Sequence, residues 1–173
     1  FTNKVIKIGD QIWTSENYPN PNKSSETNRL STENLFDLNE AKAITVPEGW
    51  RLPTAQDYQK LMITLGATPK SNAYFEDEVV GNSEVTLKLM STSKWGVRQG
   101  NNSSGFNAFP NITLLEKSLM QETFWTSSSN PQSPGYGGYI FIIHQDNQVF
   151  EKCSLFNMTG HYEASVRFVK DVK

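Results

Sequence analysis

The sequence predicts one α+β domain over residues 1–173, with two helices followed by a twisted antiparallel sheet, long loops and paired chain ends. Two segments with a helical spacing of apolar residues lie within the first 65 residues, and four β-rich segments lie after residue 120. Apolar runs at both ends of the chain lack another partner. At 173 residues, such a chain can bury roughly two thirds of its unfolded surface in one core.

The chain begins with two short apolar runs around a glycine-bearing turn. The runs are Val5–Ile8 and Gln11–Thr14, and the turn between them is Gly9-Asp10. β-Branched residues on both sides of such a turn favour a hairpin. Residues 19–31 are rich in Asn, Ser, Pro and Lys and contain one leucine, so we expect a surface loop there.

Two helices are predicted next. Apolar residues at helical spacing predict the first helix over 33–44, with Thr32 as its N-cap. The second helix, over 55–65, begins after Thr54, which is followed three residues later by Asp57 in an approximate capping box. Its apolar face is formed by Tyr58, Leu61, Met62 and Leu65, and Gly66 ends it.

The second half of the chain predicts loops and strands. Residues 67–87 are polar and acidic, so we expect an excursion of loop and short structure. Residues 96–108 predict a long glycine-rich loop. Strands are predicted over 124–127, 139–144, 148–153 and 164–169, with a turn at Asp146-Asn147.

Charge and hydropathy exclude two kinds of partner. The chain carries 16 basic and 18 acidic residues, a net charge of -2, without the basic excess that nucleic acid or an anionic membrane requires. The sequence contains no apolar run near the ~18 residues of a membrane span. The chain opens at Phe1-Thr2-Asn3 without a charged and apolar leader, and we expect the numbering to start after a removed export signal or within a longer chain.

One segment carries a recognisable motif. Val46-Pro47-Glu48-Gly49-Trp50-Arg51-Leu52-Pro53-Thr54 resembles the segment Cys-Pro-x-Gly-Trp-His-Leu-Pro-Ser of the Fibrobacter succinogenes major paralogous domain, a bacterial extracellular module. Five further motifs of that family match in order along the chain. They are Ile8 to Trp13 with Glu16-Asn17, then residues 88–95, 105–110, 124–128 and 165–171.

This resemblance implies a C-type lectin-like fold, distantly similar to formylglycine-generating enzymes. The function it implies is a non-enzymatic binding or adhesion module, exported to the exterior or cell surface of a bacterium, with a lipid anchor as one mode of attachment. A carbohydrate and a surface protein are both candidate ligands. The alternative is a structural spacer or assembly module of a cell-envelope protein without a small ligand, and an enzyme related to sulfatase activators ranks third.

The chain departs from the family pattern at two cysteines. Val46 and Phe168 stand where the family pattern has Cys. If the two family cysteines pair, their joint replacement by apolar residues predicts that Val46 and Phe168 are both buried and in contact. The same resemblance predicts that the first strand lies close to the last, so that the chain ends emerge together.

No catalytic residue, metal site or cofactor is predicted. Cys153 has no partner thiol and is predicted to be a half-buried strand residue. His144 and His161 lack a metal-ligand spacing. The acidic run Glu76-Asp77-Glu78 supplies oxygen ligands for calcium, but it lacks the alternating spacing of a calcium loop, and a solvated acidic loop is favoured.

The ligand-binding residues are expected in two loops, 96–108 and 128–138, over one end of the sheet. Their amides and phenol rings suit sugar hydroxyls or peptide backbone. The candidates are Asn101, Asn102, Asn107, Asn130, Tyr136 and Tyr139. The alternative is that the asparagines serve turns whose positive φ they tolerate.

The four tryptophans, Trp13, Trp50, Trp95 and Trp125, are predicted to be core residues. The sequence leaves the oligomeric state open.

Overall fold

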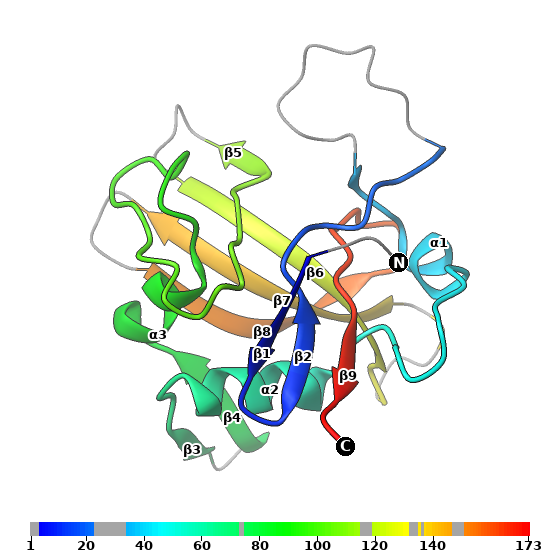
Figure 1. The fold of residues 1–173 in the computed structure, drawn as a ribbon, viewed down its shortest axis with the longest axis horizontal. Coiled ribbons are helices and arrows are strands. Elements are labelled where there is room, and N and C mark those ends of the chain that lie inside the picture. Colours follow the sequence, from blue (N-terminus) through cyan, green and yellow to red (C-terminus); the bar gives the residue numbers. More distant parts are fainter. Residues whose placement is uncertain are drawn as a thin grey trace.

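The computed structural model describes residues 4–22, 34–72, 75–114, 119–131, 135, 137–146 and 151–173. Within these ranges the chain forms a mixed α+β fold with three helices and two antiparallel sheets (Figure 1). The helices are α1 (Leu38–Lys42), α2 (Ala55–Thr64) and α3 (Ser83–Leu89). The strands are β1 (Val5–Ile8), β2 (Gln11–Thr14), β3 (Pro69–Asn72), β4 (Phe75–Gly81), β5 (Ile112–Leu114), β6 (Leu119–Ser129), β7 (Gly137–Asp146), β8 (Glu151–Thr159) and β9 (Val169–Asp171).

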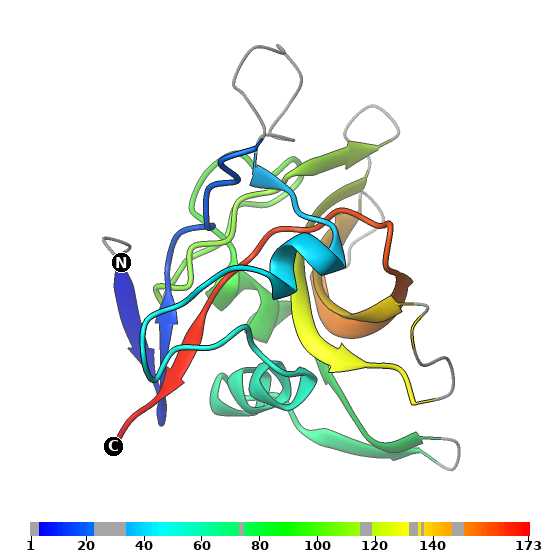
Figure 2. The same cartoon turned by 90° about the vertical axis from the view of Figure 1, so that its right-hand side faces the viewer.

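The smaller sheet contains the first and the last strand, as predicted, but Val5 and Asp171 lie at its opposite ends, so the chain ends do not emerge together. Its strand order is β1-β2-β9, and both pairings are antiparallel. The β1–β2 hairpin turns at Gly9, whose φ of 59° is a conformation that glycine adopts without steric cost. Since β1 and β9 are both antiparallel to β2, they run in the same direction, which Figures 1 and 2 both show.

The larger sheet has the order β3-β4-β8-β7-β6-β5. Its centre is the long β6–β7–β8 meander, in which β6 and β7 are paired from Leu119↔Asp146 to Ser129↔Gly138. These strands extend several residues beyond the predicted segments, because cross-strand pairing continues into polar sequence that has no strong β signal of its own. The predicted turn at Asp146-Asn147 lies partly outside the described residues.

Helix α2 confirms the clearest local prediction. Thr54 accepts a hydrogen bond from the Asp57 amide, and the Asp57 side chain accepts one from the Thr54 amide, so the capping box is complete. The helix packs its buried side chains, Tyr58, Leu61 and Met62 among them, into the core.

Helix α1 is shorter than predicted and begins later. Its N-cap is Asp37, which forms a capping box with Glu40, so the helix covers five residues and not 33–44. Phe36, which was expected inside the helix, forms an isolated bridge with Ala164 instead. This pairing fixes an extended backbone before Asp37 and delays the start of the helix. The predicted N-cap, Thr32, lies outside the described residues.

The expected excursion over 67–87 is more regular than predicted. It contains the β3–β4 hairpin and α3, whose N-cap Asn82 accepts a hydrogen bond from the Val85 amide. Strand β4 joins the large sheet through Val80↔Ser154 and Gly81↔Cys153. The acidic run is therefore part of a strand and not of a loop, because pairing with β3 overrides its low β propensity.

The core consists of two apolar clusters. The first gathers residues from α2, α3, β6 and β7, including Tyr58, Leu89, Phe124 and Phe141. The second gathers residues from α1, β6, β7 and the C-terminal segment. It includes Phe36, Leu38, Trp125, Ile140 and Phe168. Alternate residues of β6 and β7 point to different clusters, so the two clusters cover the two faces of the meander.

Most predicted core positions are confirmed. Trp13, Trp95 and Trp125 are buried, whereas Trp50 is only half-buried, with Lys170 Nζ 4.9 Å from its ring centroid. Cys153 is fully buried on β8, more deeply than the half-buried position predicted. None of the described helices is long and apolar enough to cross a membrane.

The prediction for Val46 and Phe168 is correct in part. Phe168 is buried, and Val46 packs against the cluster that contains it, but Val46 is half-buried and not buried as predicted. The segment before β9 also differs from the predicted strand over 164–169. Ala164 and Ser165 form isolated bridges with Phe36 and Phe124, and regular pairing starts only at Val169.

Candidate functional site

The connection from Ser91 to Asn111, between α3 and β5, is a long irregular loop held tightly to the fold (Figure 1). Its two sides are joined by a hydrogen bond from the Ser91 amide to the Ala108 carbonyl, 2.9 Å long. The amides of Gly100, Asn101 and Ser104 donate to carbonyls of Ser91, Leu87 and Lys88. Side-chain support comes from buried Gln145 on β7, which accepts from the Val97 amide at 2.9 Å and donates to the Arg98 carbonyl at 2.6 Å. The backbone of this loop is thus fixed without regular secondary structure.

Two of the predicted ligand-binding asparagines shape this loop. Asn102 and Asn107 have φ values of 48° and 57°, which are left-handed conformations that asparagine tolerates better than most residues. The Asn107 amide donates to Asn102 Oδ1 at 2.9 Å, and Asn102 Nδ2 donates to Asn107 Oδ1 at 3.3 Å. The two side chains therefore serve the turn. Asn101 is exposed, and its Oδ1 accepts from the Ser103 amide.

Arg167, which is buried, fastens the loop to the sheet that joins the chain ends. Its Nη1 donates at 2.8 Å to the carbonyls of Phe106 and Thr14, and its Nη2 donates at 3.3 Å to the Asn107 carbonyl. Nε donates at 2.6 Å to Asn17 Oδ1. The guanidinium also lies 4.7 Å from the centroid of the Phe106 ring. One side chain thereby joins the loop, the segment after β2 and the C-terminal segment.

Glu122 fastens the other end of the loop. This buried carboxylate on β6 accepts from Asn111 Nδ2 at 2.8 Å and from the Thr123 amide at 3.1 Å. Asn111 Nδ2 also donates to Ser165 Oγ at 3.1 Å. Burial raises the pKa of Glu122 to about 8, although hydrogen bonding with Ser165 and the charge of Arg167 act in the opposite direction. The polar network beneath the loop therefore contains a buried acid that titrates near neutral pH.

The outward side of the loop exposes apolar and cationic side chains. Val97 is 58% exposed and Phe109 is 37% exposed. Lys94 Nζ lies 5.4 Å from the Phe109 ring centroid, and the Arg98 side chain is 61% exposed. We name four exposed side chains of this loop, Lys94, Val97, Arg98 and Phe109, the loop patch. Apolar side chains that stay exposed on a fixed backbone are typical of recognition surfaces.

The second predicted loop lies at the opposite end of the large sheet. Asn130 directly follows the end of β6, whereas the Ser91–Asn111 loop contacts Gln121 near the start of β6 and Gln145 near the end of its antiparallel partner β7. The expectation that the two loops share one end of the sheet is therefore wrong. The two loops lie at the two ends of β6, and this strand of 11 residues is long enough to keep them apart.

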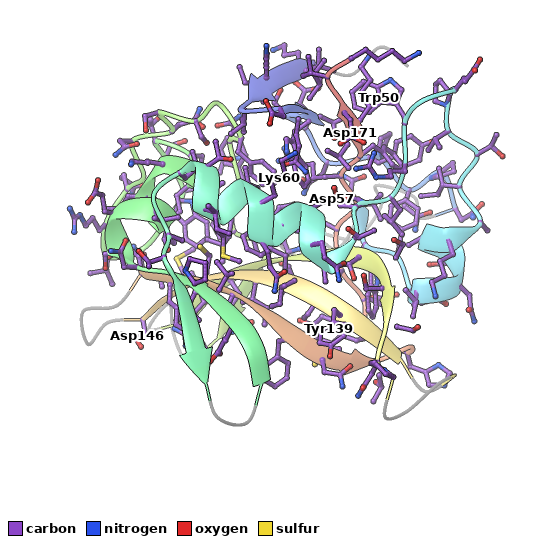
Figure 3. All side chains as sticks on the ribbon, turned by 90° about the horizontal axis from the view of Figure 1, so that it is seen from below. Trp50, Asp57, Lys60, Tyr139, Asp146 and Asp171 are labelled. Atoms are coloured by element: carbon purple, nitrogen blue, oxygen red, sulfur yellow. The ribbon has the colours of Figure 1, made fainter. Side chains whose placement is uncertain are left out.

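The remaining predicted residues form a separate group at that end. Tyr139 is half-buried on β7, opposite Asn157 of β8, and Asn130 is half-buried. Figure 3 shows Tyr139 and Asp146 at the two ends of β7. Tyr136 lies outside the described residues. The structure thus brings Asn101, Asn102 and Asn107 together and leaves Asn130 and Tyr139 apart from them.

Across the described ranges, no three His, Cys, Asp or Glu residues are grouped so that they could hold a metal ion. Burial raises the pKa of the Cys153 thiol to about 11, so this cysteine stays protonated. His144 Nε2 lies 3.8 Å from Asp146 Oδ2, and His161 is exposed.

A second polar cluster lies on the far side of α2 from Tyr139 and ties that helix to the chain ends. Arg51 Nη2 donates to Asp57 Oδ1 at 2.7 Å, and the two guanidinium Nη atoms also bond to Asp171 at 3.1 and 3.2 Å. Gln11 Nε2 donates to Asp57 Oδ1 at 3.0 Å. Figure 3 shows Trp50, Asp57, Lys60 and Asp171 in this region.

The sequence motifs contained Arg167 and Asn17 without indicating their roles, and Asn107 was predicted to bind a ligand. Glu122, Val97 and Phe109 were not predicted as residues of this candidate site. A glutamate in a strand gives no sequence signal of burial, since only the partner segments decide which strand positions are covered.

Fold and site together define a small α+β domain in which one long loop is fixed from beneath by a buried polar network. The model of the Fibrobacter succinogenes major domain family matches residues 19–170, nearly the whole chain, and the chain belongs to this family. No curated protein and no solved structure matches the chain.

Proposed function

We propose that this domain is a non-enzymatic binding or adhesion module, exported to the exterior or surface of a bacterium. Its ligand is a glycan or a surface protein, and the loop patch is the principal contact surface. Attachment to the cell through a lipid anchor on a preceding segment fits this proposal.

The observation that carries the proposal is the fixed backbone of the Ser91–Asn111 loop beneath exposed Val97 and Phe109. Exposed apolar side chains gain free energy when a ligand covers them. A loop already held in one conformation by Arg167 and Gln145 loses little further conformational entropy on binding. Asn101 adds an exposed amide on the same loop.

The proposal also assigns a C-type lectin-like arrangement to the fold. The sheet of the terminal strands, the helices and the long loop before the meander support this assignment. The residues Asn130, Tyr136 and Tyr139 remain a second proposed contact at the opposite end of the large sheet.

The test is a binding screen followed by matched surface variants. The purified domain is applied to a glycan array and to immobilised bacterial and host surface proteins, with and without calcium. Any ligand found is then titrated against V97S with F109S, and against Y136A with Y139A. I63S is the control, because Ile63 is 44% exposed on α2, outside both loops.

Loss of affinity in the first pair alone supports the loop patch, and loss in the second pair alone moves the site to the opposite end. If all three variants bind as the parent does, neither loop carries the function.

An assembly role is the second candidate, and exposed Phe156 favours it. This ring projects from the sheet face that also carries half-buried Ile142 and Met158. A structural module would use such a face to contact a neighbouring protein. Self-association that is measured by light scattering at increasing concentration, and lost in F156S, would support this role over ligand binding.

A further inference from the structure

The sheet that contains both terminal strands has a geometry that resists tension. β1 and β9 run parallel, with β2 between them, and Val5 lies opposite Thr14 while Asp171 lies opposite Gln11. Val5 and Asp171 are therefore at opposite ends of the sheet. In Figures 1 and 2, β9 runs toward the C-terminus in the same direction as β1 runs toward its turn.

This register decides how a pull between the two ends acts on the hydrogen bonds. The line from Val5 to Asp171 crosses two strand spacings, about 10 Å, and advances three residue steps along β2, also about 10 Å. A large part of the force is therefore directed along the strands. Interstrand hydrogen bonds lie perpendicular to the strands, so this part loads many of them at once.

The C-terminal strand is held on both of its sides. β9 pairs with β2, and on its other side Arg51 and Val169 exchange backbone hydrogen bonds of 2.9 and 3.0 Å. The Arg51 guanidinium bonds both Asp171 and Asp57, and Asp57 belongs to the first turn of α2. Force on Asp171 is thus transmitted through Arg51 to Asp57 and α2.

The first strand is held by its hairpin and by its inward side chains. Ile8 is buried, and Ile6 packs against the same core cluster. Gly105 of the long loop lies so close that a Cβ built there would approach Ile6 to 2.9 Å. Sliding β1 along β2 must therefore also withdraw Ile6 and Ile8 from their contacts.

From this arrangement we propose a further function for the domain, that of a tension-bearing element, in which the β1-β2-β9 sheet is a shear-loaded clamp between the chain ends. The function is independent of any ligand. If the two chain ends left the sheet at the same end, a pull between them would instead break the interstrand hydrogen bonds one at a time.

The test is single-molecule force spectroscopy in three pulling geometries on the same fold. The first applies force through handles at the two chain ends. The second uses a handle on D10C and the C-terminal handle, since the Val172 amide bonds the Asp10 carbonyl at 2.9 Å and this pull unzips β2 from β9. The third uses the N-terminal handle and E16C, since Lys4 and Ser15 are bonded at 2.9 Å and this pull unzips β1 from β2.

Both new cysteines replace exposed side chains, and the natural cysteine, Cys153, is buried, so handle attachment is specific. Equal thermal unfolding temperatures of the variants show that the fold is unchanged. We expect the mean unfolding force in the end-to-end geometry to be several-fold higher than in either unzipping geometry. An end-to-end force no higher than the unzipping forces would overturn the proposal.

Discussion

At the scale of single residues, the interior is organised around two buried ionisable groups, Arg167 and Glu122. Arg167 has carbonyl and amide oxygens around its guanidinium, and burial lowers its pKa to about 10. It therefore remains protonated at neutral pH. Burial also disfavours the charged form of Glu122, and it raises the pKa of this side chain to about 8.

The titration of Glu122 predicts a dependence of stability on pH. The folded state holds the Glu122 proton more tightly than the unfolded state, so its contribution is complete below the ordinary glutamate pKa of 4.5 and is lost as pH rises toward about 8. E122Q keeps the shape of the neutral acid, and its free energy of unfolding should fall less over this range. Urea denaturation at a series of pH values measures this. E48Q, at an exposed position, is the control, and identical profiles for E122Q and the parent protein would refute the prediction.

Replacement of Arg167 should loosen the loop as well as the fold. R167K keeps the charge but cannot reach the same four oxygens, and we expect a loss of about 3 kcal/mol in the free energy of unfolding. Hydrogen exchange should rise at the amides of residues 106–111, which the guanidinium and Glu122 hold. R98K, at an exposed arginine of the same loop, should change neither quantity.

At the scale of elements, helix α2 connects local sequence to the rest of the molecule. Its capping residue Asp57 satisfies the Thr54 amide and also accepts hydrogen bonds from Gln11 and Arg51. A helix start is thereby linked to β2 and, through Arg51, to β9. Asp57 thus caps the helix and also helps to hold the β1-β2-β9 sheet in place.

The cap itself predicts a measurable contribution. T54A removes the acceptor of the Asp57 amide, and the free energy of unfolding should fall by about 1 kcal/mol. T54S keeps the hydroxyl and should remain within a few tenths of the parent value. Chemical denaturation of the three proteins decides the matter, and a T54A protein as stable as T54S would show that the capping hydroxyl is unimportant.

At the scale of the whole molecule, the C-terminal segment unites the two core clusters. Phe168 packs in the second cluster with an edge contact to Tyr18, at 5.3 Å between ring centroids, while Val169 belongs to the first cluster. Arg167 lies between segments far apart in sequence. The segment 164–169 is thus central to the fold although it forms little regular structure.

This placement predicts unequal effects at the two positions where the family pattern has cysteine. F168A removes a buried ring and should cost about 3 to 5 kcal/mol. V46A truncates a half-buried side chain and should cost about 1 kcal/mol. Thermal and urea unfolding of both variants test this, and equal losses would mean that Val46 is covered as fully as Phe168.

The sequence by itself determined the features that depend on neighbours along the chain. The β1–β2 hairpin follows from Gly9 between β-branched runs, and α2 follows from Thr54, Asp57 and one apolar face. The family could also be recognised from the sequence, because its motifs occur in the same order along the chain. These features need only short-range hydrogen bonds and spacing, which a linear sequence records directly.

Only the tertiary structure decided which distant segments meet. It shortened α1 by pairing Phe36 with Ala164, drew β4 into the sheet through β8, and placed the two predicted binding loops at opposite ends of β6. It also buried Glu122 and brought Arg167 against the carbonyls of the long loop. The physical reason is that burial and long-range hydrogen bonding depend on which segments of the folded chain pack together, and no local pattern of residues specifies that choice.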